Sequence, residues 1–281
     1  HLQVNRHDEL LTKARKKYVS KRTSKGRRGA IYDSTRSPKA NTLAMTRVTY
    51  EVTAEPRHMD ARKWEIFEHL VRETGTNRER LKARFENEKL VSVIVARGIT
   101  VDKVTKLREL KLPGVYYRES QTRFYPKNRL ASNIIGFMNS AGKGILGIES
   151  LFNEEMQPVS GELVIERRAR GGQSAIVSKT EHSDGADVYL TISEPIQSFL
   201  EEELDALRDK IDCKSAYAIM IDPRTGGVMA MAQRPTFNAN DRSTMKRDNY
   251  APRMIEDVFE PGSIMKACSI GVVMSMRNFT F

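Results

Sequence analysis

The chain has 281 residues, a formal net charge of +11 and two cysteines. Its length suits about two domains, each able to bury a core, and no apolar run is long enough for us to expect a transmembrane helix within it. The spacing of Cys213 and Cys268 fits no metal-binding motif. We expect neither a metal nor a cofactor.

The positive charge is concentrated at the start of the chain. Residues 1–30 contain ten Lys or Arg and two acidic residues, so they carry +8 of the total of +11. Such a segment can be a solvated linker, contact anionic lipid head groups or bind nucleic acid. No nucleic-acid-binding motif with interleaved aromatic residues follows, so we expect no nucleic-acid partner.

A strand and a helix are predicted next. Alternating apolar residues predict a strand over 48–52. Residues 60–74 have apolar side chains at helical spacing, with Asp60 as a start signal and Gly75 as a stop signal. The expected buried face of this helix consists of Trp64, Phe67, Leu70 and Val71.

Three more elements complete the first part of the chain. A short helix is predicted over 77–88, a strand over 90–96 and another helix over 101–112. This alternation predicts a mixed α+β domain up to about residue 180. The turn-forming sequence at 182–185 then marks a boundary.

The second part is predicted to open with a strand and a long helix. The strand covers 188–192, and the helix covers 193–211 with Ser193 as its N-cap and Pro195 in its first turn. We expect the buried stripe of this helix to be Ile196, Phe199, Leu200, Leu204 and Leu207.

A hairpin and a final helix end the chain. Strands over 215–222 and 227–233 flank a turn rich in Pro and Gly. A polar loop is predicted over 234–260, and the Pro-Gly-Ser sequence at 261–263 opens an apolar helix that we expect to be buried in a core.

Ser263 and Lys266 form the candidate catalytic pair. Serine is a poor nucleophile unless a base lies within hydrogen-bond reach, and residues i and i+3 share one face of a helix. Partial burial can leave a lysine neutral enough to accept the proton. The alternative is that Ser263 only caps the helix while Lys266 is solvated.

The same spacing occurs twice more, so the spacing alone is weak evidence. Ser140 and Lys143 lie among glycines, which oppose a helix. A second pair, Ser243 and Lys246, lies in the predicted polar loop. Only Ser263 leads an apolar run.

Longer stretches resemble the class B penicillin-binding proteins, in the same order as in that family. The stretches similar to its transpeptidase domain are Asp222-Pro223-Arg224-Thr225-Gly226, Ala230-Met231-Ala232, Arg234-Pro235-Thr236-Phe237-Asn238 and Glu260-Pro261-Gly262-Ser263. Three motifs resemble the domain that precedes it. They are Arg28-Gly29-Ala30-Ile31-Tyr32-Asp33, the Arg-Phe-Tyr-Pro sequence at 123–126 and the Gly-Ile-Leu-Gly-Ile-Glu sequence at 144–149.

The resemblance implies a domain order. Residues 1–27 would be a basic juxtamembrane segment and residues 28–182 a non-catalytic pedestal of the dimerisation type. Residues 185–281 would be the first part of an α+β transpeptidase domain of the penicillin-binding and serine β-lactamase type. Ser263 would be the nucleophile, with its backbone N–H in the oxyanion hole, and Lys266 the general base.

The implied activity is that of a peptidoglycan D,D-transpeptidase of the division or elongation type. Such an enzyme cross-links stem peptides through an acyl-serine intermediate, and β-lactams acylate the same serine. The family also needs a Ser-x-Asn and a Lys-Thr-Gly motif after the nucleophile. Neither follows Lys266, so we expect the chain as given to be incomplete and inactive by itself.

The resemblance also implies a location and partners. A membrane anchor would precede His1, and the bulk of the chain would lie on the periplasmic side of the cytoplasmic membrane. Residues 28–182 would contact other cell-wall and division proteins.

Two alternatives stay open. The chain could act as a non-catalytic scaffold of the cell-wall synthesis machinery. It could also be a β-lactamase or a β-lactam sensor, although those proteins lack a pedestal that resembles residues 28–180.

Overall fold

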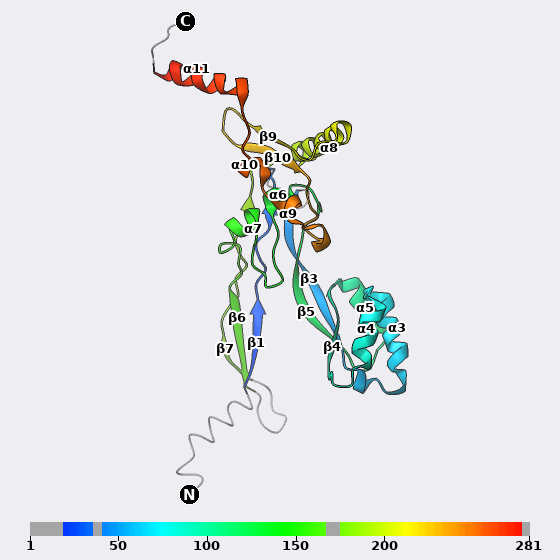
Figure 1. The fold of residues 1–281 in the computed structure, drawn as a ribbon. Coiled ribbons are helices and arrows are strands. Elements are labelled where there is room, and N and C mark those ends of the chain that lie inside the picture. Colours follow the sequence, from blue (N-terminus) through cyan, green and yellow to red (C-terminus); the bar gives the residue numbers. More distant parts are fainter. Residues whose placement is uncertain (1–18, 36–40, 167–174, 277–281) are drawn as a thin grey trace.

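The fold was obtained as a computed structural model, which describes residues 19–35, 41–166 and 175–276 (Figure 1). Most of the basic N-terminal segment, residues 1–18, lies outside the described part. Within the described ranges the strands form sheets of three, five and two strands, and helices accompany two of them. The fold therefore mixes α and β structure, as predicted.

The three-stranded sheet contains β1 (Val19–Lys25), β6 (Ser160–Glu166) and β7 (Ala175–Lys179). Both neighbouring pairs are antiparallel, with β6 in the middle. Residues 19–25 thus form a strand, although they fall inside the segment expected to be juxtamembrane. The domain boundaries drawn from the sequence stay predictions.

The five-stranded sheet is built around one long strand, β3 (Thr42–Ala54). It pairs antiparallel with β5 (Val115–Phe124) over ten residue pairs and with β4 (Val93–Ile99) on its other side. The sheet continues through β2 (Ile31–Tyr32) to β8 (Val188–Tyr189), which runs parallel to β2. The sequence indicated only the middle of β3, because its first half lacks a clear alternation.

Three helices pack against β3 and β4 and form what we call the helical head. They are α3 (Lys63–Thr74), α4 (Arg78–Glu86) and α5 (Val101–Glu109). Two short 3₁₀ turns, η1 (Pro56–His58) and η2 (Asp60–Arg62), lead into α3.

The core of the helical head follows the predicted faces in part. Phe67 and Leu70 are fully buried, as expected, whereas Trp64 is 45% exposed and Ile66 is buried in its place. Gly75 ends α3 in the left-handed region with φ 71°, as predicted. Asp60 begins η2 instead of capping α3, because a 3₁₀ turn precedes that helix.

A second core joins the two predicted parts of the chain. Its buried members come from residues before and after the expected boundary and include Ile31, Tyr125, Ile135, Ile192 and Phe237. The short helices α6 (Ser132–Ile135) and α7 (Gly147–Leu151) border it. The two parts are therefore held by one shared core.

The predicted long helix and hairpin are α8 (Glu194–Ile211), β9 (Ala216–Ile221) and β10 (Val228–Arg234). The buried face predicted for α8 is right only in part, because Leu204 is buried as expected but two of its other members are not. Phe199 and Leu207 are 58% and 45% exposed, while Gln197 and Glu201 are buried beside Leu204. The physical reason is that α8 packs on β10 through hydrogen bonds to polar side chains, described below.

The predicted polar loop contains three short helical segments. They are η3 (Arg242–Thr244), α9 (Arg247–Tyr250) and α10 (Arg253–Glu256). The loop also buries Phe237 completely, so it is less polar in its packing than its composition indicates.

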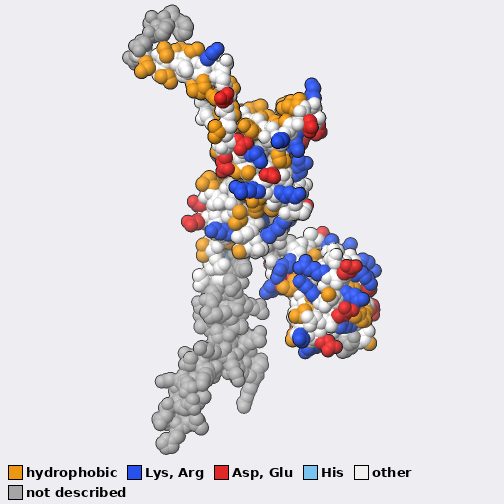
Figure 2. Space-filling view, in the orientation of Figure 1, with side chains coloured by type: hydrophobic (Ala, Val, Ile, Leu, Met, Phe, Trp, Pro, Cys, Tyr) orange, Lys and Arg blue, Asp and Glu red, His pale blue; other side chains and the backbone are white. Residues whose placement is uncertain are grey.

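The last described elements are η4 (Gly262–Ile264) and α11 (Met265–Ser275). The helix formed as predicted, but its predicted burial is wrong. Every residue of α11 is exposed, and the helix projects away from the rest of the fold (Figures 1 and 2). Within the described residues its main contacts are with η4, which leads directly into it. Among the described residues no helix is long and apolar enough to cross a membrane.

Candidate active site and the contacts that support it

Ser263 and Lys266 lie on one continuous helical stretch. Ser263 is in η4 and Lys266 is in the first turn of α11, which follows directly. A spacing of three residues places their side chains on one face. Neither element has a side-chain cap, so Ser263 does not act as the N-cap that the alternative interpretation required.

The surroundings of this pair are open. Both residues are exposed, and within the described part of the chain neither the Ser263 hydroxyl nor the Lys266 amine forms a hydrogen bond. The helix that carries them is apolar on all sides, with Ile270 57% and Val272 58% exposed. Helices of that composition are usually buried.

The two other Ser-x-x-Lys pairs have different local structure. Ser140 lies in a turn in which the Asn139 side chain accepts hydrogen bonds from the backbone of Ala141 and Lys143. Ser243 donates its hydroxyl proton to Asp241 Oδ1 at 2.8 Å. Of the three serines, only Ser263 shares a continuous helix with its lysine and keeps its hydroxyl uncommitted among the described residues.

The three motifs of the first part of the chain meet at Glu149, whose side chain is fully buried. Arg28 Nε lies 2.9 Å from Glu149 Oε2, and Arg123 Nε lies 2.6 Å from Oε1. The Tyr125 hydroxyl also donates to Oε1, at 3.3 Å. Burial and the nearby Glu149 charge raise the pKa of Tyr125, so this hydroxyl stays a donor.

These side chains also bind backbone groups from separate segments. Arg28 Nη2 donates to the Glu149 carbonyl at 2.8 Å, and Arg123 Nη1 donates to the Gly29 carbonyl at 2.7 Å. Two guanidinium groups share one carboxylate, so the cluster keeps a charge of +1. The cluster ties β5, α7 and the segment before β2 together.

A second buried cluster joins α8 to the end of β10. Arg234 Nε lies 2.5 Å from Asp205 Oδ1, and Arg234 Nη2 lies 3.2 Å from Glu201 Oε2. The Arg234 side chain is 3% exposed, whereas that of Asp205 is 47% exposed. The hydrogen bond from Arg234 lowers the pKa of Asp205.

Gln197 fixes the same helix to the middle of β10. Its Oε1 accepts the Met231 N–H at 2.8 Å, and its Nε2 donates to the Met231 carbonyl at 2.9 Å. Gln197 Nε2 also donates to Glu201 Oε1, which accepts the backbone N–H of Ala131 at 2.7 Å. Glu201 therefore contacts both parts of the chain.

The polypeptide that Glu201 reaches is residues 125–135, which we call the junction segment. On its other side it contacts the loop after β10. The Asn240 side chain accepts a hydrogen bond from the Tyr125 N–H at 3.0 Å and donates one to the Tyr125 carbonyl at 2.8 Å. Ser132 and Thr236 share a hydroxyl contact of 2.8 Å, and Asn133 donates to the Asn249 carbonyl at 2.9 Å. The junction segment thus connects β5 with the loop that leads toward Ser263.

The sequence did not indicate Glu201, Asp205 or Arg234 as a unit. Gln197, Glu201 and Asp205 are spaced four residues apart on α8, which places them on one helical face. That periodicity was visible, but the apolar stripe on the other face was the stronger signal.

No metal site or disulfide contributes to these clusters. The described residues contain no group of three or more His, Cys, Asp or Glu that could hold a metal ion. Cys213 and Cys268 are unpaired.

Two family models match the chain. The first is described as the penicillin-binding protein dimerisation domain and matches residues 23–190. The second is described as the penicillin-binding protein transpeptidase domain and matches residues 216–279, which include Ser263 and Lys266.

Curated relatives show the same similarity. The peptidoglycan D,D-transpeptidase FtsI of Escherichia coli K12 is 32% identical over 189 residues, which cover 67% of this chain and 32% of that protein. The probable peptidoglycan D,D-transpeptidase PbpC of Pseudomonas aeruginosa is 27% identical over 282 residues, covering 99% of this chain and 49% of that protein. The chain thus spans about a third to a half of the length of these relatives.

Solved structures have a similar fold. A peptidoglycan synthetase from Bifidobacterium adolescentis aligns with a TM-score of 0.63 at 22% identity, over 93% of this chain and 52% of that one. Penicillin-binding protein 2X from Streptococcus thermophilus aligns with a TM-score of 0.55 at 23% identity, over 82% of this chain and 37% of that one. At these identities the likeness concerns the fold alone.

Proposed function

The chain belongs to the penicillin-binding protein family, with its dimerisation domain and part of its transpeptidase domain, and we propose that it serves as a peptidoglycan D,D-transpeptidase. The observation that carries this proposal is the Ser263–Lys266 pair. It lies inside the transpeptidase match and on one continuous helical stretch, where a spacing of three residues puts the two side chains on one face, so that a small movement can bring the base to the serine.

In the proposed reaction Ser263 Oγ attacks the carbonyl carbon of the penultimate D-Ala of a stem peptide while Lys266 accepts the hydroxyl proton. The tetrahedral intermediate collapses, the C–N bond breaks and the terminal D-Ala leaves as an amine after taking up the proton. An amine of a second stem peptide then attacks the ester, and the serine regains its proton. The backbone N–H of Ser263 would donate to the oxyanion.

The exposed position of α11 supports one further part of the proposal. An apolar helix that carries the nucleophile needs a covering surface, both to exclude water and to place the base beside the serine. The Ser-x-Asn and Lys-Thr-Gly motifs would belong to that surface, and the 281 residues contain neither after Lys266. We therefore expect these 281 residues alone to show no transpeptidation.

We also propose a location and partners, on the basis of the family to which the chain belongs. We place the protein at the cytoplasmic membrane with its bulk in the periplasm, where peptidoglycan is made. Residues 28–182 would contact other cell-wall or division proteins. The scaffold function would stand alone if the protein at its natural length had no activity.

The test is release of D-Ala from a stem-peptide analogue by the protein at its natural length. Ser263→Ala and Lys266→Ala should each reduce the rate at least about a hundredfold. The matched control is Ser243→Ala, because Ser243 also heads a Ser-x-x-Lys sequence but lies outside the proposed site. Unchanged turnover in Ser263→Ala, or loss of turnover in Ser243→Ala alone, would overturn the assignment.

A further inference from the structure

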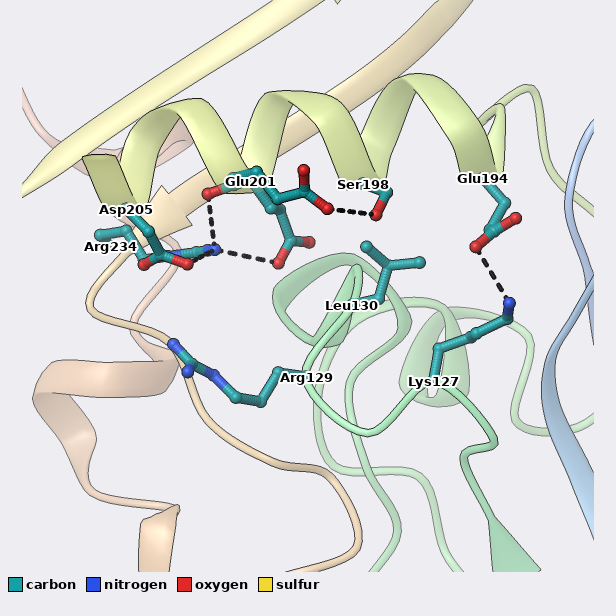
Figure 3. Close-up of a pocket in the computed structure, with 9 residues that line it drawn as sticks. Lys127, Arg129, Leu130, Glu194, Ser198, Glu201, Asp205 and Arg234 are labelled. Atoms are coloured by element: carbon teal, nitrogen blue, oxygen red, sulfur yellow. Dashed lines mark hydrogen bonds and ion pairs between the residues drawn. The ribbon is translucent and has the colours of Figure 1, made fainter. Parts of the chain in front are cut away.

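A groove of about 400 Å³ lies between α8 and the start of the junction segment (Figure 3). One wall is a single face of α8. Its surface groups are the carboxylates of Glu194, Glu202 and Asp205 and the hydroxyl of Ser198. These residues are spaced three or four apart, so they line one side of the helix over about 16 Å.

The opposite wall carries the opposite charge. It consists of Lys127, Arg129 and Leu130 from the junction segment, which face α8 across the groove (Figure 3). Leu130 provides an apolar surface between the charged rows. The groove is therefore dipolar, with negative charge on the helix and positive charge on the loop.

Ion pairs close the two ends of the groove. At one end Lys127 Nζ lies 3.0 Å from Glu194 Oε1, and at the other end Arg234 holds Asp205. The charged groups in these two ion pairs already have partners, so they are less available to bind a ligand.

Two further charged groups line the groove, one of each sign. Glu202 accepts only the Ser198 hydroxyl, at 3.3 Å, among the described residues. Within the described residues the guanidinium group of Arg129 forms no hydrogen bond or ion pair, and its charge acts on the Asp205 carboxylate, whose pKa it helps Arg234 to lower. These two groups are available to a ligand, and they stand on opposite walls.

The chemistry of the ligand follows from this placement. An ammonium group would lie against Glu202 and a carboxylate against Arg129, since charge-assisted hydrogen bonds are the strong ones. The groove's volume of about 400 Å³ suits a ligand of two or three small residues. Leu130 favours small apolar side chains there.

We propose that this groove is a binding site for a short peptide with free amino and carboxyl ends and small side chains. Ser263 does not line the groove. The proposal therefore goes beyond the proposed transpeptidation and does not depend on it.

The test measures binding of the dipeptide alanyl-alanine, in its L,L and D,D forms, to the 281-residue chain by isothermal titration calorimetry. We expect saturable binding of one form in the millimolar range, as suits so small a ligand. Arg129→Ala and Glu202→Ala should each weaken binding about tenfold or more, because each removes a charged hydrogen-bond partner. Both residues are outside the buried clusters, so the fold should survive. Lys103→Ala, an exposed change in the helical head, is the control.

Capped dipeptides separate the two contacts. N-acetyl-alanyl-alanine should bind about tenfold more weakly to the wild type and should be insensitive to Glu202→Ala, while Arg129→Ala still weakens it. Alanyl-alanine amide should show the reverse pattern.

Three results would overturn the proposal. They are no saturable binding at tens of millimolar, equal binding to both variants and the wild type, and equal binding of capped and free dipeptides. None of these outcomes bears on Ser263, because the probe needs no acylation.

Discussion

At the scale of single residues, Glu149 joins the three motifs of the first part of the chain. It is fully buried and is held by Arg28 and Arg123, which come from two other motifs of the first part of the chain. The sequence placed all three motifs in order but could not show that they meet. Contact between residues 121 and 26 positions apart in the chain depends on the fold, not on local pattern.

We predict that Glu149→Gln lowers the free energy of unfolding by about 3–5 kcal/mol, because it leaves two buried guanidinium groups without a counter-charge. Urea unfolding of the 281-residue chain measures the change. Glu154→Gln, an exposed neutralisation nearby, should change it by no more than about 0.5 kcal/mol. A loss below about 1 kcal/mol in Glu149→Gln would show that the arginines find other partners.

Asp205 gives a pH-dependent prediction with a defined sign. Arg234 lowers the folded-state pKa of Asp205, so the ionised form stabilises the fold above the unfolded pKa of about 3.9. That contribution is lost as the pH falls through the folded pKa. Asp205 is half exposed, so solvent screening limits the effect at pH 7 to about 1 kcal/mol or less.

The measurement is urea unfolding of the wild type and Asp205→Asn between pH 7 and pH 3. The stability difference should be largest at neutral pH and should shrink below about pH 4. Asp209→Asn, on the same helix, is the control. A difference that stays constant with pH would mean that the Arg234 contact does not depend on charge.

At the scale of elements, the sequence predicted where helices and strands form better than which faces they bury. The long helix and the hairpin of the second part were both found. The face predicted for α8 was right at Leu204 but missed Gln197 and Glu201, which are buried by specific partners on β10 and at Ala131. An apolar stripe shows that a helix face can be buried. Which face is buried depends on the residues, distant in the sequence, that the helix contacts in the fold.

We predict that Gln197→Leu lowers the free energy of unfolding by about 2–4 kcal/mol, because it leaves the Met231 N–H and carbonyl without partners. The Met231 amide should also exchange with solvent deuterium faster than in the wild type. Glu203→Leu on the exposed side of α8 is the matched control. Unchanged protection at Met231 would contradict the role given to Gln197.

At the scale of the whole molecule, the shared core and the junction segment make the two predicted parts one connected body. Exposed apolar side chains are concentrated on α11, with further ones on α8 and β9, including Phe199, Ile219 and Ile221. The sequence predicted that α11 would be apolar and helical. Whether α11 is buried could not be predicted from its own residues, because a helix is buried only where another surface packs against it.

We predict that the 281-residue chain self-associates through α11 as its concentration rises, because contiguous exposed apolar surface drives association. Ile270→Glu combined with Val272→Glu should shift the sedimentation profile toward the monomer. The unfolding midpoint should stay unchanged, since α11 makes no contact with either core. Lys82→Glu in the helical head should leave association as it is, and equal association of all three proteins would refute this role of α11.

The central claim, that Ser263 is the nucleophile, is tested most directly by mapping where penicillin binds covalently. Cells expressing the gene at its natural length are treated with a labelled penicillin, and the modified peptide of the purified protein is identified by mass spectrometry. We predict one adduct on Ser263, and none in Ser263→Ala. An adduct on Ser140 or Ser243, or one that persists in Ser263→Ala, would contradict the claim.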